Sequence, residues 1–418
     1  MKRILFLLIL LWALQTSLTA QQTRSLSSDI HTVRVVADGD VLLPPFVPLG
    51  RSRIHISFDR MDHEYTRYIY KVQFCNADWT PATEVFESDY LAGFNGQPIE
   101  DYETSFNTAQ LYTHYHLTLP NENCRLLLPG NYRVTIYDED DDENPVAEAC
   151  FGFYTQQMNV SASVSANTDI DYNKTHQQVT MSVAYGGRKV VDPRRELHTV
   201  VLQNRRWDNA AIDVEPNIQN VNGVEWTHRR ELIFPAGNEY HKFELLDVHQ
   251  NGMGVDRISW FDPYFHATLF ASQPARNYVD DADANGSYII RHSGDEANDT
   301  QSEYVLVHFI FESEPLADGD VYVCGLWADG EPDPRCRMDY NEAEGAYETA
   351  ILLKQGYYSY QYRSYPHGGG AGKTDRTDGN FYETENEYLI LVYHRPQGAR
   401  YDALVGMARM NGDPKRRR

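Results

Sequence analysis

Cysteine, cationic side chains and helical patterns are all scarce in this sequence. Its 418 residues include 5 cysteines, and no two of them have the Cys-x-x-Cys spacing typical of redox and zinc sites. Lys and Arg number 37 against 60 Asp and Glu, so the formal net charge is −23. A surface this acidic repels nucleic acid and anionic lipid. We therefore expect neither of them to be a partner.

Residues 1–20 have the three parts of an export signal. Lys2-Arg3 is a basic start, Ile4–Leu14 is an apolar core, and Leu18-Thr19-Ala20 is a small-residue cleavage site. The core is too short to span a bilayer as a stable helix, so we expect no direct membrane insertion. No Cys follows Ala20, which argues against a lipid anchor. We expect a soluble periplasmic product with 35 basic and 60 acidic residues, a net charge of −25.

Short alternating runs separated by turn formers dominate the rest of the chain. In Leu111–Leu119, positions 111, 113, 115, 117 and 119 fall on one face and include three leucines, while His114 and His116 fall on the other. This period of two predicts a strand with one buried face. Similar runs, with turn signals about every 8–12 residues, predict an all-β protein of two or three immunoglobulin-like β-sandwich domains in tandem. The expected divisions are a signal peptide (1–20), a first sandwich (21–155), a middle β-domain (156–300), a C-terminal sandwich (301–410) and a basic tail (411–418).

Large aromatic rings are concentrated between the predicted strands Tyr68–Phe74 and Leu111–Leu119. A solvated loop seldom contains so many rings, so this excursion must pack onto the sheet or face a partner. Interface anchors are often Trp, Tyr or Phe, and the rings exceed what one thin sandwich layer readily buries. The alternative is that the rings at 79, 94 and 106 all point into the domain's own core. The candidate partner-binding residues are Trp79, Tyr90, Phe94, Asn95 and Phe106.

The same excursion carries recognisable motifs. They are Cys75-Asn76-Ala77-Asp78-Trp79-Thr80, Asp89-Tyr90-Leu91-Ala92-Gly93-Phe94-Asn95, Ser105-Phe106-Asn107-Thr108, Tyr112-Thr113-His114-Tyr115 and Gly130-Asn131-Tyr132-Arg133. With Gly379–Asn386 and Tyr393–Pro396 near the C-terminus, they resemble the type IX secretion system plug protein family, formerly classed as a domain of unknown function. The middle third of the chain matches far less clearly.

This resemblance implies a non-catalytic periplasmic protein. Such proteins plug the periplasmic opening of the outer-membrane translocon barrel when no cargo is present, so that barrel is the implied partner. A pore wide enough for folded proteins would leak solutes whenever it stood empty. The resemblance thus implies a location at the outer membrane through a protein partner.

A second resemblance begins at Tyr304. The order strand, Gly-aromatic turn, strand, Lys-x-Gly turn, Tyr-rich strand is similar to the small sandwich that accompanies glycogen-active enzymes as a carbohydrate-binding module. The family's second Trp is absent, because Ala328-Asp329-Gly330 stands in its place. We take the fold from this resemblance and not the sugar binding. An exported carbohydrate-binding or carbohydrate-processing protein is the alternative function.

Patterns that would indicate catalysis, metal or cofactor binding are weak. His114-x-His116 has a spacing that some metal sites use, but no third ligand is identifiable and a solvent-facing pair explains it equally. Asp138–Glu143 is a run of acids that could bind Ca²⁺, and a solvated turn that blunts edge pairing is favoured instead. Gly368–Thr374 resembles a phosphate loop but has His367 where a Gly is needed. We assign no catalytic residue, metal ligand or cofactor.

Two cysteines form a candidate disulfide. Cys324 and Cys336 flank a turn-containing stretch, and an exported protein meets an oxidising compartment. The other three leave one odd thiol, which we expect to be buried.

The export signal gives a first prediction. N-terminal sequencing of periplasmic material should give Gln21 as the first residue, because cleavage is expected after Ala20. A cytoplasmic form that begins at Met1 would contradict secretion.

Overall fold

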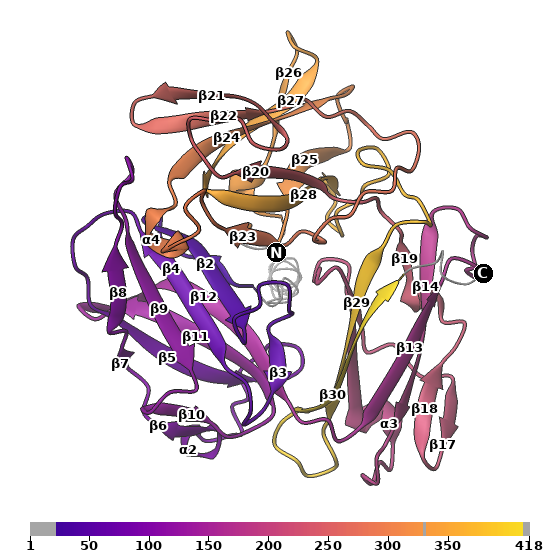
Figure 1. Ribbon diagram of the computed structural model, residues 1–418. Coiled ribbons are helices and arrows are strands. Elements are labelled where there is room, and N and C mark those ends of the chain that lie inside the picture. The colour runs from indigo at the N-terminus through magenta and orange to yellow at the C-terminus, as the bar shows by residue number, and fades with distance from the viewer. Residues whose placement is uncertain (1–21, 329–331, 413–418) are drawn as a thin grey trace, which may run out of the picture.

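The computed structural model describes residues 22–328 and 332–412. The predicted signal peptide and residues 413–418 of the predicted basic tail lie outside the described residues. Strands dominate the fold and helices are short, which confirms the predicted class of all-β sandwiches in tandem. Figure 1 shows three groups of strands arranged around a centre, and we call them units 1, 2 and 3.

Unit 1 comprises the described residues up to 155 and is a sandwich of two sheets. One sheet has the order β1 (Arg24–Ser25), β12 (Asp141–Tyr154), β11 (Gly130–Asp138), β5 (Tyr68–Cys75) and β7 (Gln97–Pro98), with β3 (Phe46–Pro48) parallel to β12. The other has the order β2 (Ile30–Ala37), β4 (Ile54–Arg60), β9 (Thr113–Leu119) and β8 (Asp101–Thr104). A small pair, β6 (Leu91–Gly93) with β10 (Cys124–Leu126), follows the helix α2 (Glu87–Tyr90) at one end.

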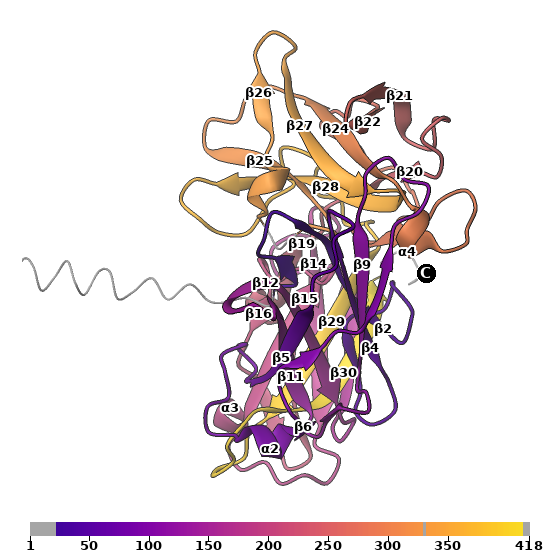
Figure 2. The ribbon, with the colours of Figure 1, turned by 90° about the vertical axis from the view of Figure 1, so that its left-hand side faces the viewer.

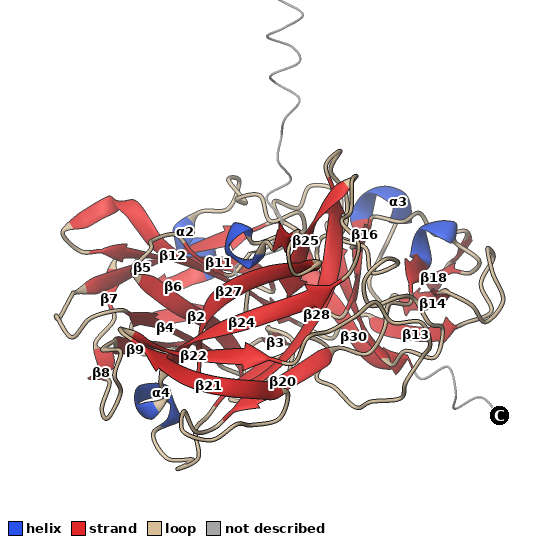
Figure 3. Cartoon of the chain, turned by 90° about the horizontal axis from the view of Figure 1, so that it is seen from above, coloured by secondary structure: helices blue, strands red, loops and turns tan. Residues whose placement is uncertain are grey.

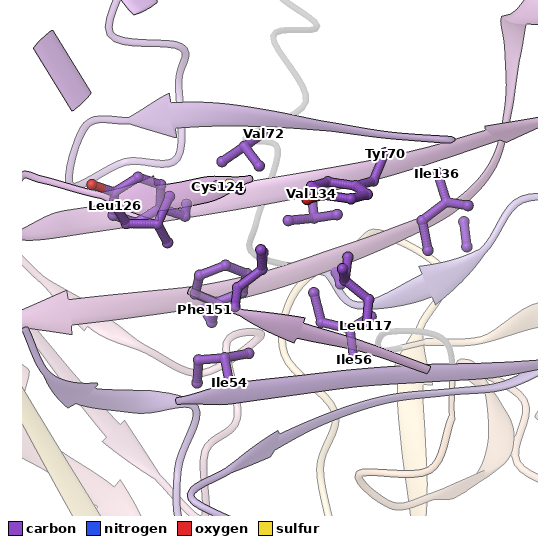
Figure 4. Close-up of a cluster of buried hydrophobic side chains, with 14 of the residues drawn as sticks. Ile54, Ile56, Tyr70, Val72, Leu117, Cys124, Leu126, Val134, Ile136 and Phe151 are labelled. Carbon is purple, nitrogen blue, oxygen red and sulfur yellow. The ribbon is translucent and has the colours of Figure 1, made fainter. Parts of the chain in front are cut away.

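The core of unit 1 lies between these two sheets. Figure 4 shows Ile54 and Ile56 of β4 facing Val134, Ile136 and Phe151 of the opposite sheet. Alternation along each strand produces this core, since every second side chain points inward. Within β9, Thr113 and His114 are both buried although they point to opposite faces. The outer face at that end of the strand is covered by another unit.

Unit 2 is built from two separate parts of the chain, 156–236 and 386–412. One sheet has the order β13 (Asn159–Ser165), β14 (His176–Ala184), β18 (Gly223–Trp226) and β17 (Ile218–Asn220), with β19 (Ile233–Pro235) on β14. The other has the order β16 (Ala211–Ile212), β15 (Leu197–Gln203), β29 (Asn386–His394) and β30 (Ala403–Gly412). Two short helices complete it, α3 (Pro193–Glu196) and η1 (Arg230–Leu232).

Unit 3 comprises residues 241–366 and lies between the two parts of unit 2 in sequence. One sheet contains β20 (His241–Leu245), β28 (Gly356–Pro366) and β23 (Tyr288–Ile290), with β25 (Gly319–Cys324) on β28. The other has the order β21 (Val255–Phe261), β22 (Tyr264–Leu269), β24 (Tyr304–Glu312), β27 (Ala346–Lys354) and β26 (Asp339–Asn341), and it faces the viewer in Figure 3. The short helices are α4 (Asn298–Gln301) and η2 (Pro334–Cys336).

Pairing between strands joins two of the domain ranges that the sequence analysis kept separate, 156–300 and 301–410. The full length of β15, inside the expected middle range 156–300, pairs with β29, inside the expected C-terminal range 301–410. These two ranges therefore share one sheet and one core, to which Val201, Ile390 and Val405 all contribute. We propose that unit 3 is an insertion into unit 2.

The candidate disulfide residues both lie in unit 3, and all five cysteines are buried. Cys336 belongs to the core cluster of unit 3, and Cys324 ends the strand β25. Oxidation of this pair stays a prediction. Mass mapping of periplasmic protein without reduction should yield a linked peptide pair, and separate thiol peptides at both positions would exclude the bridge.

Candidate functional site

Two of the predicted partner-binding rings are buried, and this corrects their assignment. Trp79 is 1% exposed, and its ring contacts Phe46 at 6.5 Å and Trp207 of unit 2 at 5.9 Å between centroids. Tyr90 is 9% exposed, stacks on Phe74 and donates its hydroxyl hydrogen bond to the carbonyl of Val72. Side chains enclosed in this way present no surface to a partner while the fold is intact. The alternation pattern could not reveal this, because the rings come from a non-repetitive segment.

Asn95 holds the backbone of its own loop. Its Oδ1 accepts from the amide of Val72 at 2.6 Å, and its Nδ2 donates to the carbonyl of Val72 at 3.0 Å. The same Nδ2 donates to the carboxylate of Glu87 at 2.9 Å. Asn95 therefore ties the loop after β6 both to β5 and to the start of α2. These contacts hold the backbone next to Phe94 in place.

The residues that directly precede Asn95 and Glu87 both carry exposed aromatic rings. Phe94 is 76% exposed, and Phe86, which precedes α2, is 73% exposed. We call Phe86 and Phe94 the aromatic tip. It lies at the end of unit 1 that is remote from unit 3, beside α2 and β6 in Figures 1 and 2. Sequence reasoning did not select Phe86 as a site residue, because hydrophobicity alone does not distinguish an exposed ring from a buried one.

Phe106 is also exposed, at 64%, but it does not join the aromatic tip. Its backbone amide donates to the carbonyl of Thr300 in unit 3, so it lies at the opposite end of unit 1. The structure thus separates Phe94 and Phe106, which the sequence had grouped into one surface.

A buried ion pair joins unit 1 to unit 3. Nζ of Lys354 on β27 lies 2.6 Å from Oδ2 of Asp59 on β4, and both side chains are 1% exposed. His114 Nδ1 lies 2.6 Å from the other carboxylate oxygen. The hydroxyl of Tyr304 donates to Asp59 at 2.7 Å. The ammonium group also donates to the carbonyl of Asp299 at 2.6 Å.

The electrostatics of this cluster keep Asp59 ionised. Burial raises the pKa of Asp59, but Lys354 and His114 outweigh burial and lower the pKa to about 2. Burial also lowers the pKa of Lys354, although Asp59 opposes this. Because the folded pKa of Asp59 lies below its ordinary value, the pair contributes stability above about pH 4 that is lost as pH falls towards 2.

Further polar contacts surround the ion pair. The Glu303 carboxylate accepts from the backbone amides of Ala109 and Gln110, and Tyr112 donates its hydroxyl hydrogen bond to the carbonyl of Ser302 at 2.8 Å. Arg34 of β2 lies 2.9 Å from Asp299 of α4. We call this set, with the Asp59–Lys354 pair, the charged joint.

The joint between units 1 and 2 has an apolar core, with ion pairs such as Arg400–Asp89 at 2.9 Å beside it. One core cluster combines residues of both units, among them Trp79, Cys150, Leu202, Leu391 and Leu404. Within this joint, the buried Tyr393 donates its hydroxyl hydrogen bond to the buried Asn131 at 2.9 Å.

Units 2 and 3 meet around Asp208. Its carboxylate accepts from Arg206 at 2.8 Å, from the amide of Gly372 at 2.8 Å and from the hydroxyl of Tyr365 at 3.2 Å. Gly372 belongs to the glycine-rich loop that resembles a phosphate loop in sequence. Its amide is used here to bind a carboxylate of the protein itself.

The histidine pair on β9 is divided between two partners. His114 contacts Asp59 in the charged joint, whereas His116 pairs with Asp101 at 3.1 Å and stacks on His55. Among residues 22–328 and 332–412, no group of three or more His, Cys, Asp or Glu side chains is arranged to hold a metal ion. The described helices also include none that is long and apolar enough to cross a membrane.

The Trp of the Gly-aromatic turn in unit 3 packs against that unit's core, whereas Trp260, Phe261 and Phe270 of the same unit are exposed. Trp327, the aromatic residue of the Gly-aromatic turn, is half-buried, and its Nε1 donates to the carbonyl of Ser359 at 3.2 Å. Its ring lies near Phe309 and Tyr358, both buried. This ring therefore packs inside the sandwich.

The fold and its joints define a class of protein: an all-β chain of three sandwich units locked together by buried contacts. Residues 30–155 of the chain are a type 9 secretion system plug protein 1st domain, since the family's model matches them. That segment corresponds to unit 1.

One solved structure resembles almost the whole chain. It is the crystal structure of a hypothetical protein from Parabacteroides merdae, 40% identical, with a TM-score of 0.91. The match covers 93% of this chain and 99% of the other. No curated protein matches.

The charged joint gives a prediction about stability. Lys354→Met should lower the free energy of unfolding by about 3–5 kcal/mol, because it leaves the Asp59 carboxylate buried without its cation. The double variant Asp59→Asn, Lys354→Met should lose less than Lys354→Met alone, since no buried charge remains unpaired. Denaturant unfolding measures both losses.

Arg376→Ala is the matched control, because it breaks an ion pair with Asp318 on the surface. We expect this variant to lose no more than about 1 kcal/mol. Equal losses in Lys354→Met and Arg376→Ala would contradict a strong buried pair.

Proposed function

We propose that this chain plugs the periplasmic opening of the outer-membrane translocon barrel of the type IX secretion system when no cargo is present. The observation that carries the proposal is the family match over residues 30–155. The plug family makes involvement in type IX secretion the expected role, with a location in the periplasm near the outer membrane. The chain acts without catalysis, as an interaction protein.

The joints support this proposal physically. A cover over a wide pore must not deform under thermal motion, and a chain of separate sandwiches on flexible linkers would deform. Here units 1 and 2 share an apolar core, and unit 3 is held to unit 1 by the charged joint. Well-packed interiors are stiff and change shape only between discrete arrangements. Three units joined in this way form a broad, firm body.

The aromatic tip supplies candidate anchors for the partner. Phe86 and Phe94 are large apolar side chains on a backbone that Asn95 fixes, so they lose little freedom when they bind. Phe106 is retained as a separate candidate contact at the other end of unit 1. The carbohydrate-binding alternative has less support, because Trp327 packs against the core of unit 3.

Substitutions in the segment between β5 and β9 should distinguish rings that bind the partner from rings that pack in the core. Phe86→Ala with Phe94→Ala should leave the melting curve nearly unchanged and weaken co-purification with the outer-membrane barrel, because both rings are exposed. Trp79→Ala should cost about 3–5 kcal/mol of stability, because it empties a buried position. Co-purification from solubilised outer membranes and thermal unfolding are the two measurements.

Val221→Ala on unit 2 is the control for the loss of exposed apolar surface, since Val221 is 94% exposed and lies on a different unit. It should change neither measurement. If the paired tip variant binds the barrel as tightly as the parent, the tip is not the anchor.

Deletion of the whole gene tests the plug itself. The outer membrane of the deletion strain should leak large solutes while some export continues, because an empty barrel stays open. Uptake of a large antibiotic or dye is the measurement, with the restored gene as control. A deletion strain as tight as the parent, even with cargo and other channel-occupying partners removed, would refute the proposal.

A further inference from the structure

A cavity of about 210 Å³ lies where the three units meet. Unit 1 contributes residues of β2 and of the segment that leads into β3. Unit 2 contributes Leu202, Trp207 and Leu389, and unit 3 contributes Tyr288 and Leu326. Its volume is several times the roughly 30 Å³ that one water molecule occupies in the liquid. The lining includes residues of β2, β3, β23 and β29.

Four consecutive residues of β2, Val33 to Val36, line this cavity. Successive side chains of a strand point to opposite faces, so a cavity on one face would contact only alternate residues. Val33 belongs to the core of unit 1, whereas the Arg34 side chain reaches Asp299 of unit 3. Contact with residues of both orientations means that the cavity follows the edge of β2, where the backbone groups lie.

That edge is open to a further strand. In the described part of the chain, β2 is the terminal strand of its sheet and pairs with β4 alone. An unpaired edge presents a row of amide and carbonyl groups that can pair with another chain. The edge strand β8 of the same sheet carries Asp101 and Glu103, and all four of its residues are exposed. Charged side chains on an edge strand discourage its pairing with another chain. On the edge strand β2, residues Val33 to Val36 include three valines instead.

The lining indicates which side chains a paired strand would carry. Pro44 and Pro45 lack amide hydrogens, so this wall offers apolar contact without competing for hydrogen bonds. The three arginines of the lining already have acidic partners. The pairs are Arg34–Asp299 at 2.9 Å, Arg205–Glu387 at 3.2 Å and Arg206–Asp208 at 2.8 Å. The lining is therefore close to neutral and favours an uncharged ligand.

We propose that the cavity binds an extended, uncharged peptide segment of a partner protein, which pairs with the edge of β2. At about 3.3 Å per residue, the four lining residues fit a segment of about four residues. Backbone hydrogen bonds to β2 supply the affinity, and the apolar walls select the side chains. The charged joint fixes β2 against unit 3, through Arg34 and through the hydroxyls of Thr32 and Tyr304, which lie 2.6 Å apart. This site goes beyond the proposed plug function and does not depend on it.

Calorimetry with the mature periplasmic protein tests the proposal. The probe is a hexapeptide of alternating Val and Thr, capped at both ends. A matched peptide carries N-methyl groups on alternate amides along one edge, which removes the donors for strand pairing. We expect saturable binding of the first peptide and binding at least tenfold weaker by the second. No saturable binding, or equal binding of both peptides, would overturn the proposal.

Variants locate the binding. Val35→Pro and Val36→Pro each remove one amide hydrogen, and adjacent amides point to opposite edges, so one of these variants removes a donor that faces the cavity. Leu326→Trp fills the cavity from unit 3 without altering β2. Gln219→Pro is the matched control, because it changes the edge strand β17 of unit 2. We expect tenfold or greater loss in Leu326→Trp and in the folded proline variant of β2, and none in the control. Undiminished binding to Leu326→Trp would place the peptide elsewhere and refute the site.

Discussion

The ion pair between Asp59 and Lys354 is the constraint on which the arrangement of the units depends. Removing two charges from water costs several kcal/mol for each ion, and this cost is recovered only when every partner is correctly placed. Here His114, Tyr304 and the carbonyl of Asp299 complete the coordination. A small rotation of unit 3 would leave a buried charge unpaired. We infer that the pair selects one orientation of unit 3 on unit 1.

The apolar joint between units 1 and 2 has a complementary role. Hydrophobic burial is roughly proportional to area and has little directional preference, so it holds surfaces together without fixing their angle. The cluster around Trp79 supplies this adhesion. Directional hydrogen bonds, such as that from Tyr393 to Asn131, then fix the register. The apolar cluster thus holds units 1 and 2 together, and the charged joint sets the orientation of unit 3 on unit 1.

Unit 3 lies in sequence between the two parts of unit 2, and this order closes the arrangement. Because β29 returns to pair with β15, both ends of unit 3 are attached to the same sheet. The contact with unit 1 then completes a ring of three units, as Figure 1 shows. Such a ring leaves a cavity at its centre unless side chains fill it, and the edge of β2 lies along that cavity. The edge of β2 stays unpaired because unit 3 covers the face of this sheet and not the edge of its last strand.

The sequence by itself determined the fold class and the family. Alternation in runs such as Leu111–Leu119 depends only on neighbouring residues, and the strand β9 (Thr113–Leu119) follows from it. Short motifs such as those around Trp79 and Gly130 were enough for the family, which the match to residues 30–155 confirms. Tertiary structure alone decided which rings are exposed, because Trp79 and Phe94 are both large aromatic residues, yet one is covered by neighbouring elements and the other is not. It also decided the pairing of β15 with β29 and of Asp59 with Lys354, since contacts between residues far apart in sequence leave no local pattern.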